Sequence, residues 1–410
     1  MSLRMKSVIT IIFALVLTSV YATGWGDSIF SINGLGEISY PVDGQARGMG
    51  GITLAFLEGR GVSFINPAIV GAVDTTTVTA VFLFEQRKVK DSTSRTNIYS
   101  WGPKFMRLVV PISHGFVIGG GIAPYSDVNF HLRDTGLHLG SDTGTPNEPY
   151  TLHVSADGGT RLGSVTLAKN FGNRLYFGLC ANFLFGSITQ EWRRDFSNSE
   201  FEDSDDLYDT HYFGQIYCGG IALRPHRRWT FGFLFSRSGT IEATTERSSV
   251  SGTMDQEKNE LDFPDAYGIG TTCRLFPRVT IGADIYTRMW KKFRLNGTEV
   301  PEYENTTRYS FGCEVTPTPD KLASFFQKRP WRIGFYHKPW YYRDARGNRP
   351  SETFFTMGTS IFFKERRGTL DIALEIGKRG SIAENGAQEW VFRQSLSVVG
   401  WERWFQKRQY

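Results

Sequence analysis

The sequence has few long apolar runs, little net charge for its size and few cysteines. Its one long apolar run, at residues 8–20, is too short to span a bilayer well as a helix. A mean hydropathy of −0.27 also excludes a helical membrane protein. The 46 basic and 41 acidic residues leave a net charge of +5 on 410 residues, and the basic residues are scattered. This argues against nucleic-acid binding, which requires a concentrated basic surface.

The sequence also lacks the motifs of common enzymes. It contains no Gly-x-Ser-x-Gly elbow, no His-Glu-x-x-His pair and no phosphate-binding loop. We therefore expect no enzyme, no cofactor and no resident metal. One alternative stays open: His131, His138, His153 and Ser155 are parts from which a lipase or deacylase site on a barrel rim could be built. Another is the acidic run at 202–209, which could hold a divalent cation or be a solvated loop.

The first 22 residues have the pattern of a secretory signal. Arg4 and Lys6 precede the apolar run, and small residues end the segment at Ala22. No cysteine lies near this point, which argues against a lipoprotein. Export without a helical anchor points to the periplasm or the outer membrane.

Aromatic residues make up 14% of the sequence, and apolar residues alternate with polar ones in several segments. Leu370, Ile372 and Ile376, for example, alternate with Asp371 and Glu375. Period-two alternation predicts strands with one apolar face. A transmembrane barrel explains abundant aromatics at low hydropathy, because only alternate residues face lipid. We expect strands near 76–86, 97–110, 115–125, 158–170, 174–188, 210–224, 228–241, 260–275, 278–290, 305–316, 330–342, 352–364, 368–379 and 388–404.

The expected connections alternate in length. Outer-membrane barrels have short periplasmic turns and long outer loops, whereas a soluble sandwich has no reason to sort its loops this way. We therefore expect both chain ends in the periplasm. The segment 317–329 is the exception, because it is long for its place on the short side. Short breaks fall at 111–114, 170–173, 225–228, 276–277 and 365–368, and long polar segments at 126–157, 189–209 and 242–259.

Residues 44–70 are rich in glycine, poor in charge and without a lasting period, so this stretch cannot build a core of its own. Two motifs lie within it, first Ala46-Arg47-Gly48-Met49-Gly50 and then Asn66-Pro67-Ala68. In this order, and this near the N-terminus, they resemble the N-terminal hatch of the FadL-type outer-membrane transporters of hydrophobic compounds. A glycine-rich loop of another β protein is the alternative.

The resemblance implies an all-β fold, a 14-stranded antiparallel transmembrane β-barrel with an N-terminal hatch. It divides the chain into a signal peptide at 1–22, a hatch inside the barrel at 23–75 and the barrel at 76–410. It also implies a kinked third strand that opens the barrel wall beside the hatch. In this chain the matching stretch carries Gly119, Gly120, Gly121 and Pro124. A glycine bend without an opening is the alternative.

The function implied is passive outer-membrane transport of a hydrophobic or amphipathic small molecule, with lateral release beside the hatch. Asn66, Pro67 and Ala68 are the expected hatch motif, with Asn66 capping a turn. The rival is a docking scaffold for a protein-secretion or surface-assembly system. Expected partners are outer-membrane lipid and lipopolysaccharide, a hydrophobic ligand, and a protein at the periplasmic or outer face. Phe56, Phe64 and Ile65 are expected to line the ligand pocket, with ordinary barrel packing as their alternative.

Two of the four cysteines are placed to meet. Counted from the shared short turns, Cys180 and Cys218 lie at similar height on neighbouring strands and both point inward. Cys273 and Cys313 face outward with one strand between them, roughly 9–10 Å apart, too far to bridge. We expect at most one disulfide, Cys180–Cys218, and four free thiols as the alternative.

Overall fold

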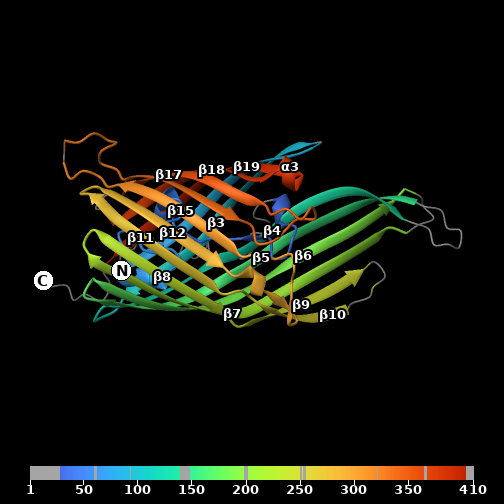
Figure 1. The fold of residues 1–410 in the computed structure, drawn as a ribbon, viewed down its shortest axis with the longest axis horizontal. Helices are drawn as coiled ribbons and strands as arrows, with labels where there is room; N and C mark the ends of the chain where they lie inside the picture. The colour runs from blue at the N-terminus through green and yellow to red at the C-terminus, as the bar shows by residue number, and fades with distance from the viewer. Residues whose placement is uncertain are drawn as a thin grey trace, which may run out of the picture.

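Fourteen antiparallel strands close into a barrel in which each strand pairs with its neighbour along the chain (Figure 1). The computed structural model describes residues 28–59, 62–92, 94–138, 148–197, 202–249, 252, 255–320, 322–363 and 367–402. The last strand pairs with the first, from Ala387↔Asp91 to Glu402↔Thr76, and so closes the ring. The predicted signal peptide lies outside the described residues.

Two of the fourteen barrel strands are interrupted, each by an irregular step. Gly239 separates β8 from β9, and residues 263–265 separate β10 from β11. The barrel strands are β2 (Thr76–Asp91), β3 (Arg95–Pro111), β4 (Phe116–His138), β5 (Glu148–Phe171), β6 (Leu175–Phe196), β7 (Ser204–His226), β8 (Trp229–Ser238) with β9 (Thr240–Ser249), β10 (Asp255–Asp262) with β11 (Ala266–Phe276), β12 (Val279–Arg288), β15 (Thr306–Val315), β16 (Trp331–Pro339), β17 (Ser351–Phe362), β18 (Gly368–Ser381) and β19 (Ala387–Glu402).

The predicted alternation is confirmed in the burial of the strands. In β6, Phe177 and Leu179 are exposed on the outer face, whereas Tyr176 and Cys180, on the alternate positions, are buried. In β18, Asp371 and Glu375 point inward and are buried. An apolar outer face around a polar interior defines a membrane-spanning barrel of the outer-membrane type.

The predicted long outer loops are wrong in their extent. β4 continues to His138 and β5 begins at Glu148, so most of the segment 126–157 is strand. The segments 189–209 and 242–259 are likewise extensions of β6 with β7 and of β9 with β10. The arm of β4 and β5 does carry an apolar period, because Val128, Phe130 and Leu132 alternate with polar residues and pack with Val154 and Ala156, whereas most residues of β9 and β10 are polar. In Figure 1 the arms of β4 to β7 project beyond the rest of the barrel.

The described N-terminal residues 28–59 and 62–74, called here the lumenal segment, lie inside the barrel. Met49, Ile52 and Leu54 have no exposed surface, and Gly44 N donates to Ser397 Oγ of β19 at 2.7 Å. On other strands, Thr53 N donates to Asp284 Oδ2 at 2.7 Å. The segment therefore fills part of the lumen, and its role as a hatch stays a prediction. Its elements are η1 (Ile29–Ser31), β1 (Glu37–Ile38), α2 (Gly44–Gly48) and η2 (Pro67–Ala72).

One wall of the barrel lies directly against the backbone of the lumenal segment. A Cβ at Gly312 would collide with the carbonyl oxygen of Met49, and one at Gly232 with that of Leu54. These positions need glycine because two backbones approach closely, whatever their φ angles. The inward-facing glycines of this wall that meet the lumenal segment are called the glycine wall: Gly232, Gly268, Gly270, Gly282, Gly312, Gly334 and Gly358.

Aromatic side chains cover the lumen toward the side of the long arms. Trp290 stacks on Tyr341 with 4.4 Å between ring centroids, and Phe30 packs on Trp340 at 5.9 Å. Short elements in the connections carry or flank these rings: η3 (Trp290–Lys292), β13 (Arg294–Leu295), β14 (Thr298–Glu299) and α3 (Ile382–Asn385). Among the described residues, none of the helices combines the length and the apolar character needed to span a bilayer.

The cysteine prediction holds. Cys180 and Cys218 are direct partners across β6 and β7 and form a disulfide, with 5.0 Å between their Cα atoms. Cys273 and Cys313 are free and flank Ile281 of β12, one on each side. The alternative of four free thiols is therefore wrong.

Candidate functional site

The barrel wall divides between its second and third strands. β3 pairs with β4 only from Met106↔Ile122 to Pro111↔Val117. β2 follows β3 up to Arg95, and β5 follows β4 up to His138. Among the described residues, β3 and β4 have no ladder beyond Met106 and Ile122, and this division is called the wall gap.

The lumenal segment takes the place of β3 along the free edge of β4. β1 pairs with β4 through Glu37↔Asp127 and Ile38↔Ser126. Ser39 N donates to Tyr125 O at 2.9 Å, and Ser28 N to Asn129 O at 3.0 Å. Residues 28–39 thus close the β4 side of the wall gap from within.

Glu37 fastens this closure to strands beside the wall gap. Its carboxylate accepts hydrogen bonds from Arg87 of β2, Arg379 of β18 and Arg393 of β19, each with one bond at 3.0 Å. Arg379 also donates to Glu352 at 2.8 Å. Buried charges must be paired, and removing one partner leaves the others uncompensated. Glu37 therefore links the lumenal segment to arginines of three barrel strands.

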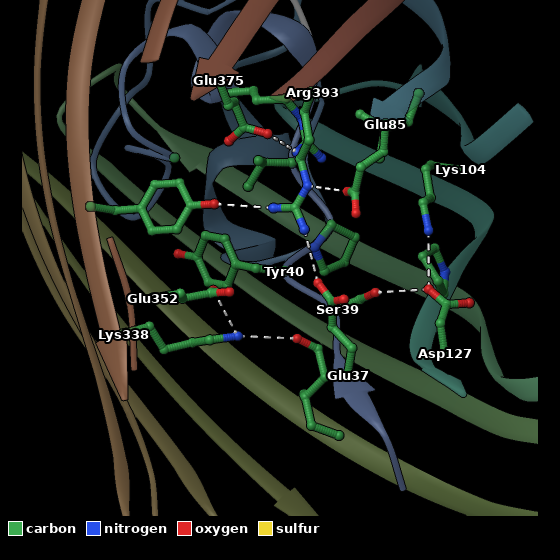
Figure 2. Close-up of a pocket in the computed structure, with 18 of the residues that line it drawn as sticks. Glu37, Ser39, Tyr40, Glu85, Lys104, Asp127, Lys338, Glu352, Glu375 and Arg393 are labelled. Atoms are coloured by element: carbon green, nitrogen blue, oxygen red, sulfur yellow. Dashed lines mark hydrogen bonds and ion pairs between the residues drawn. The ribbon is translucent and has the colours of Figure 1, made fainter. Parts of the chain in front are cut away.

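A second ion pair crosses the wall gap directly. Lys104 of β3 reaches Asp127 of β4 with 3.0 Å between Nζ and Oδ2 (Figure 2). Arg161 of β5 holds the other oxygen of Asp127 at 2.9 Å, and Ser39 Oγ lies 3.5 Å from Oδ2. These side chains join the two strands where their backbones do not.

Two small cavities adjoin the closure. One of about 70 Å³ is lined by Glu37, Tyr40, Lys104 and Asp127 among others, and Figure 2 shows these side chains around it. Its neighbour, of about 40 Å³, shares Tyr40 with it. Pockets for drug-sized ligands measure about 300–1,000 Å³. In the described part of the chain, these two cavities beside the closure are therefore too small for such a ligand.

The residues expected to line a pocket lie in three separate places. Phe56 packs with Met49 and Ile52. Phe64 meets Phe105 edge-to-face at 5.2 Å, and Ile65 packs on the cluster around Leu54 and the disulfide. None of the three borders the two cavities at Tyr40. Their role in ligand binding stays a prediction.

The Asn66-Pro67-Ala68 motif caps η2, as its sequence predicts. Asn66 Oδ1 accepts from Ala68 N at 3.0 Å, Nδ2 donates to Leu54 O at 2.7 Å, and Pro67 is the first helical residue. A Cβ at Gly220 would collide with Asn66 Oδ1, so β7 lies close against this turn. The motif fixes the fold of the lumenal segment, while its role in a moving hatch stays a prediction.

The glycine run lies in the part of β4 that still pairs with β3, and Pro124 lies beyond the end of that ladder, beside the wall gap. Gly119, Gly120 and Gly121 pair with both β3 and β5. Pro124 adjoins the β-bulge where the register of β4 against β5 shifts. The ladder to β3 ends one residue after Gly121. The assignment of these four residues to a lateral opening stays a prediction, with Pro124 nearest to the observed division.

The parts of the enzyme alternative meet on the long arms, but not in a catalytic order. His131, Ser155 and Glu191 are successive cross-strand partners on β4, β5 and β6. Ser155 Oγ lies 3.5 Å from Glu191 Oε2, so the serine stands between the histidine and the acid. A serine nucleophile needs the histidine between itself and the acid. Among the described residues no group of three or more His, Cys, Asp or Glu side chains could hold a metal ion.

Sequence reasoning missed the charged residues around Glu37. A usable signal existed, because Asp371, Glu375 and Arg379 repeat on the inward face of β18. Charged side chains on the lumen face of several strands indicate a polar interior that needs compensation. Glu37, the partner of Arg379, lies 342 positions away and carries no local pattern.

The fold belongs to the class of FadL-type outer-membrane barrels, as comparison with solved structures shows. Similar structures include the Ralstonia pickettii toluene transporter TbuX (13% identity, TM-score 0.58, covering 88% of this chain and 98% of that one). The monoaromatic hydrocarbon channel CymD gives 14% identity, a TM-score of 0.59 and coverage of 89% and 99%. A Pseudomonas aeruginosa FadL homologue gives 12%, 0.58, and 88% and 98%. The resemblance expected from the sequence thus holds at the level of fold.

The family itself is given by a sequence model. A family model described as BamG matches residues 4–213 and 226–410, and the chain belongs to that family. Among curated proteins, none matches this chain.

Proposed function

We propose that this barrel carries hydrophobic or amphipathic small molecules passively across the outer membrane and releases them sideways through the wall gap. Residues 28–39 act as the gate. The observation that carries this proposal is that the free edge of β4 is covered by the lumenal segment instead of by β3. An apolar ligand gains nothing by passing into water, so a lateral path into the bilayer suits it.

The gate is shut in the arrangement described here. Transport requires residues 28–39 to withdraw from β4, because the cavities beside them hold only about 70 and 40 Å³. Withdrawal breaks two backbone pairs and the ion pairs of Glu37. The substrate class is supported by the fold, since TbuX is a toluene transporter and CymD a monoaromatic hydrocarbon channel. We include no catalytic step in this function.

A reversible cross-link of the gate tests the proposal. Ile38 and Ser126 are direct partners, so an Ile38→Cys/Ser126→Cys variant, with Cys273 and Cys313 changed to alanine, ties β1 to β4 under oxidising conditions. We expect oxidation to stop toluene uptake and reduction to restore it. A matched control places the cysteines at Leu370 and Val398, partners in the closed wall of β18 and β19. Equal uptake in the locked and control barrels would remove the gate from the proposal.

A docking scaffold for protein secretion or surface assembly is the second candidate. The observation that favours it is the tight fastening of the lumenal segment, which meets the glycine wall and leaves only small cavities beside the closure. The same locked variant separates the two functions. A scaffold does not need the gate to open. If the protein is a scaffold, surface assembly therefore continues in cells that carry the cross-linked variant, and the cross-link does not change toluene uptake. Failure of surface assembly on locking would count against the scaffold.

A further inference from the structure

The connection between β15 and β16 presents apolar side chains on an ordered loop. The described residues 316–320 and 322–330, called here the aromatic loop, expose 95% of Leu322, 61% of Phe325 and 64% of Phe326. Thr318 N donates to Gln327 O at 2.9 Å and Lys328 N to Ser324 O at 3.1 Å. The loop therefore holds its apolar groups outward in a fixed shape. In Figure 1 it is the orange loop that projects at one end of the barrel.

These side chains continue the lipid-facing surface of the barrel. Phe326 stacks on Trp331 with 5.9 Å between ring centroids, and Trp331 Nε1 donates to Phe326 O at 2.9 Å. Trp331 begins β16, whose next outward residue, Ile333, is 63% exposed on the barrel wall. Aromatic rings at the end of a lipid-facing strand lie at headgroup depth. The aromatic loop thus belongs to the bilayer surface on the side of the short turns, which face the periplasm.

The same rim is basic. Lys328 and Arg329 end the aromatic loop, and the guanidinium of Arg329 lies 3.9 Å from the ring centre of Phe325. The loop's described carboxylate, Asp320, accepts the backbone N–H of Leu322 at 2.9 Å. Nearby, Glu58 of the lumenal segment is paired with Arg274 of β11. Other short turns at this rim add Arg227, Arg228, Arg278 and Arg367. Basic residues at a membrane surface favour anionic headgroups.

An apolar groove runs along the wall from the foot of this loop. It measures about 1,020 Å³ and is lined by outward-facing side chains of β11 to β19, among them Ile281, Phe311, Cys313, Ile333 and Phe355. Ile281, Cys313 and Ile333 are cross-strand partners, and each lies two residues from the strand end at this rim.

The groove has a structural cause. The inner face of the same wall carries Gly282, Gly312 and Gly334 of the glycine wall, so the strands sink toward Met49 and Ile52. The outer surface is hollow there because the inner surface has no side chains to hold the strands away. The groove therefore follows from the close contact between the barrel wall and the lumenal segment.

We propose that the groove and the aromatic loop together bind an anionic phospholipid of the periplasmic leaflet. An acyl chain lies in the groove, and the phosphate contacts Lys328 and Arg329. The groove opens at the short-turn rim, so its ligand comes from the periplasmic leaflet and not from outer-leaflet lipopolysaccharide. The argument uses the outward face of the barrel and does not depend on whether the gate moves.

The test is a lipid titration of the folded, full-length protein followed by native mass spectrometry. Phosphatidylglycerol is compared with phosphatidylcholine of the same chains and with lipid A. We expect phosphatidylglycerol to bind more tightly than either. A Lys328→Gln/Arg329→Gln variant should lose about thirtyfold of the preference for phosphatidylglycerol over phosphatidylcholine, at about a factor of five per basic residue. Arg227→Gln/Arg228→Gln, on another turn of the same rim, is the matched control and should keep most of the preference.

A second pair of variants tests the groove. Ala283→Phe fills it from its floor and should weaken binding of both phospholipids, whereas Ile221→Phe on the far wall should leave binding unchanged. Heat-modifiable migration on gels confirms that each variant is folded. Equal binding of the two phospholipids by the wild type overturns the proposal, as does preference for lipid A. A stoichiometric protein that co-purifies with the wild type, is lost with Phe326→Ser and leaves lipid binding unchanged would assign the loop to a protein partner and also overturn it.

Discussion

The two sides of the lumen hold the lumenal segment by different kinds of contact. At the glycine wall, backbone lies against backbone, as at Gly312 and Met49. At the wall gap, residues 28–39 are held by two strand pairs and by the ion pairs of Glu37. Close backbone packing cannot be released in steps, because a small separation already forfeits its dispersion energy. Ion pairs can exchange partners with water or with another charge. The difference indicates that motion of the segment, if function requires it, is confined to the side of the wall gap.

The largest expected effect comes from filling the glycine wall. Gly312→Val places a side chain against the carbonyl oxygen of Met49. Overpacking between side chains costs about 1–3 kcal/mol, and here neither backbone can turn away, so we expect the folded barrel to be lost. The heat-modifiable band on gels measures this. Gly219→Val, whose new Cβ would meet only a methyl group of Leu179 at 3.5 Å, should keep the band. A folded Gly312→Val barrel would contradict the close approach.

A smaller, local effect is expected at Glu37. Glu37→Gln leaves Arg87, Arg379 and Arg393 with one carboxylate fewer, and losing one partner of a buried charge pair costs about 3 kcal/mol or more. We expect faster hydrogen exchange at the amides of Ser28 and Ser39, with the barrel strands unchanged. Glu299→Gln, which alters an exposed pair with Arg294, is the control. Uniform loosening of all strands would mean that Glu37 stabilises the whole barrel and not the gate.

The ion pair across the wall gap should contribute less. Lys104→Met removes one of two cations on Asp127, and Arg161 remains in place. Both side chains are largely buried, but Asp127 keeps one cation, so we expect a smaller loss than the roughly 3 kcal/mol of an unpaired buried charge. Exchange should quicken near Ser39 and Asp127 by less than in Glu37→Gln. Lys90→Met, at an exposed site on β2, provides the comparison. An effect larger than that of Glu37→Gln would mean that the Lys104–Asp127 pair holds residues 28–39 in place more strongly than Glu37 does.

The smallest expected effect depends on pH and lies outside the membrane. Hydrogen bonds from Lys291 and Arg343 lower the pKa of Glu304, in the connection between β12 and β15. A carboxyl group with a lowered pKa stabilises the fold above its unfolded pKa, and that contribution is lost as pH falls through the folded pKa. Protection of the Glu304 amide, which donates to Tyr341 O at 2.7 Å, should therefore fall in acid once the intrinsic pH dependence of amide exchange is divided out. In Glu304→Gln this dependence should disappear, and its persistence would assign it to another group.

Much of the barrel could be predicted from the sequence because its information is local. The alternation in β6 and β18 gives each strand its two faces, and counting from the short turns is enough to bring Cys180 opposite Cys218. The glycine-rich stretch can form no core alone, which agrees with its place inside the barrel. The extensions β9 and β10 could not be predicted, since most of their residues are polar, whereas the alternation of Val128, Phe130 and Leu132 in β4 was a usable signal.

The candidate site was harder to predict than the fold. Glu37 has no motif, and its partners Arg379 and Arg393 come from the opposite end of the chain. The wall gap is the absence of backbone pairing between the described parts of β3 and β4 beyond Met106 and Ile122, and no residue type predicts such an absence. Pro124 lies beside it. Phe56, Phe64 and Ile65 are apolar and lie near the expected hatch. Ordinary packing inside a barrel favours the same kind of residue, so their sequence does not distinguish the two roles.

The disulfide has a consequence for assembly. Cys180 and Cys218 are opposite each other only in the native register of β6 and β7, because a slip of one residue turns one of the two side chains to the other face. The exported chain passes through an oxidising compartment before it enters the bilayer. Oxidation there selects hairpins that are already in register, so the bond acts as a check on strand alignment before insertion makes an error costly to undo.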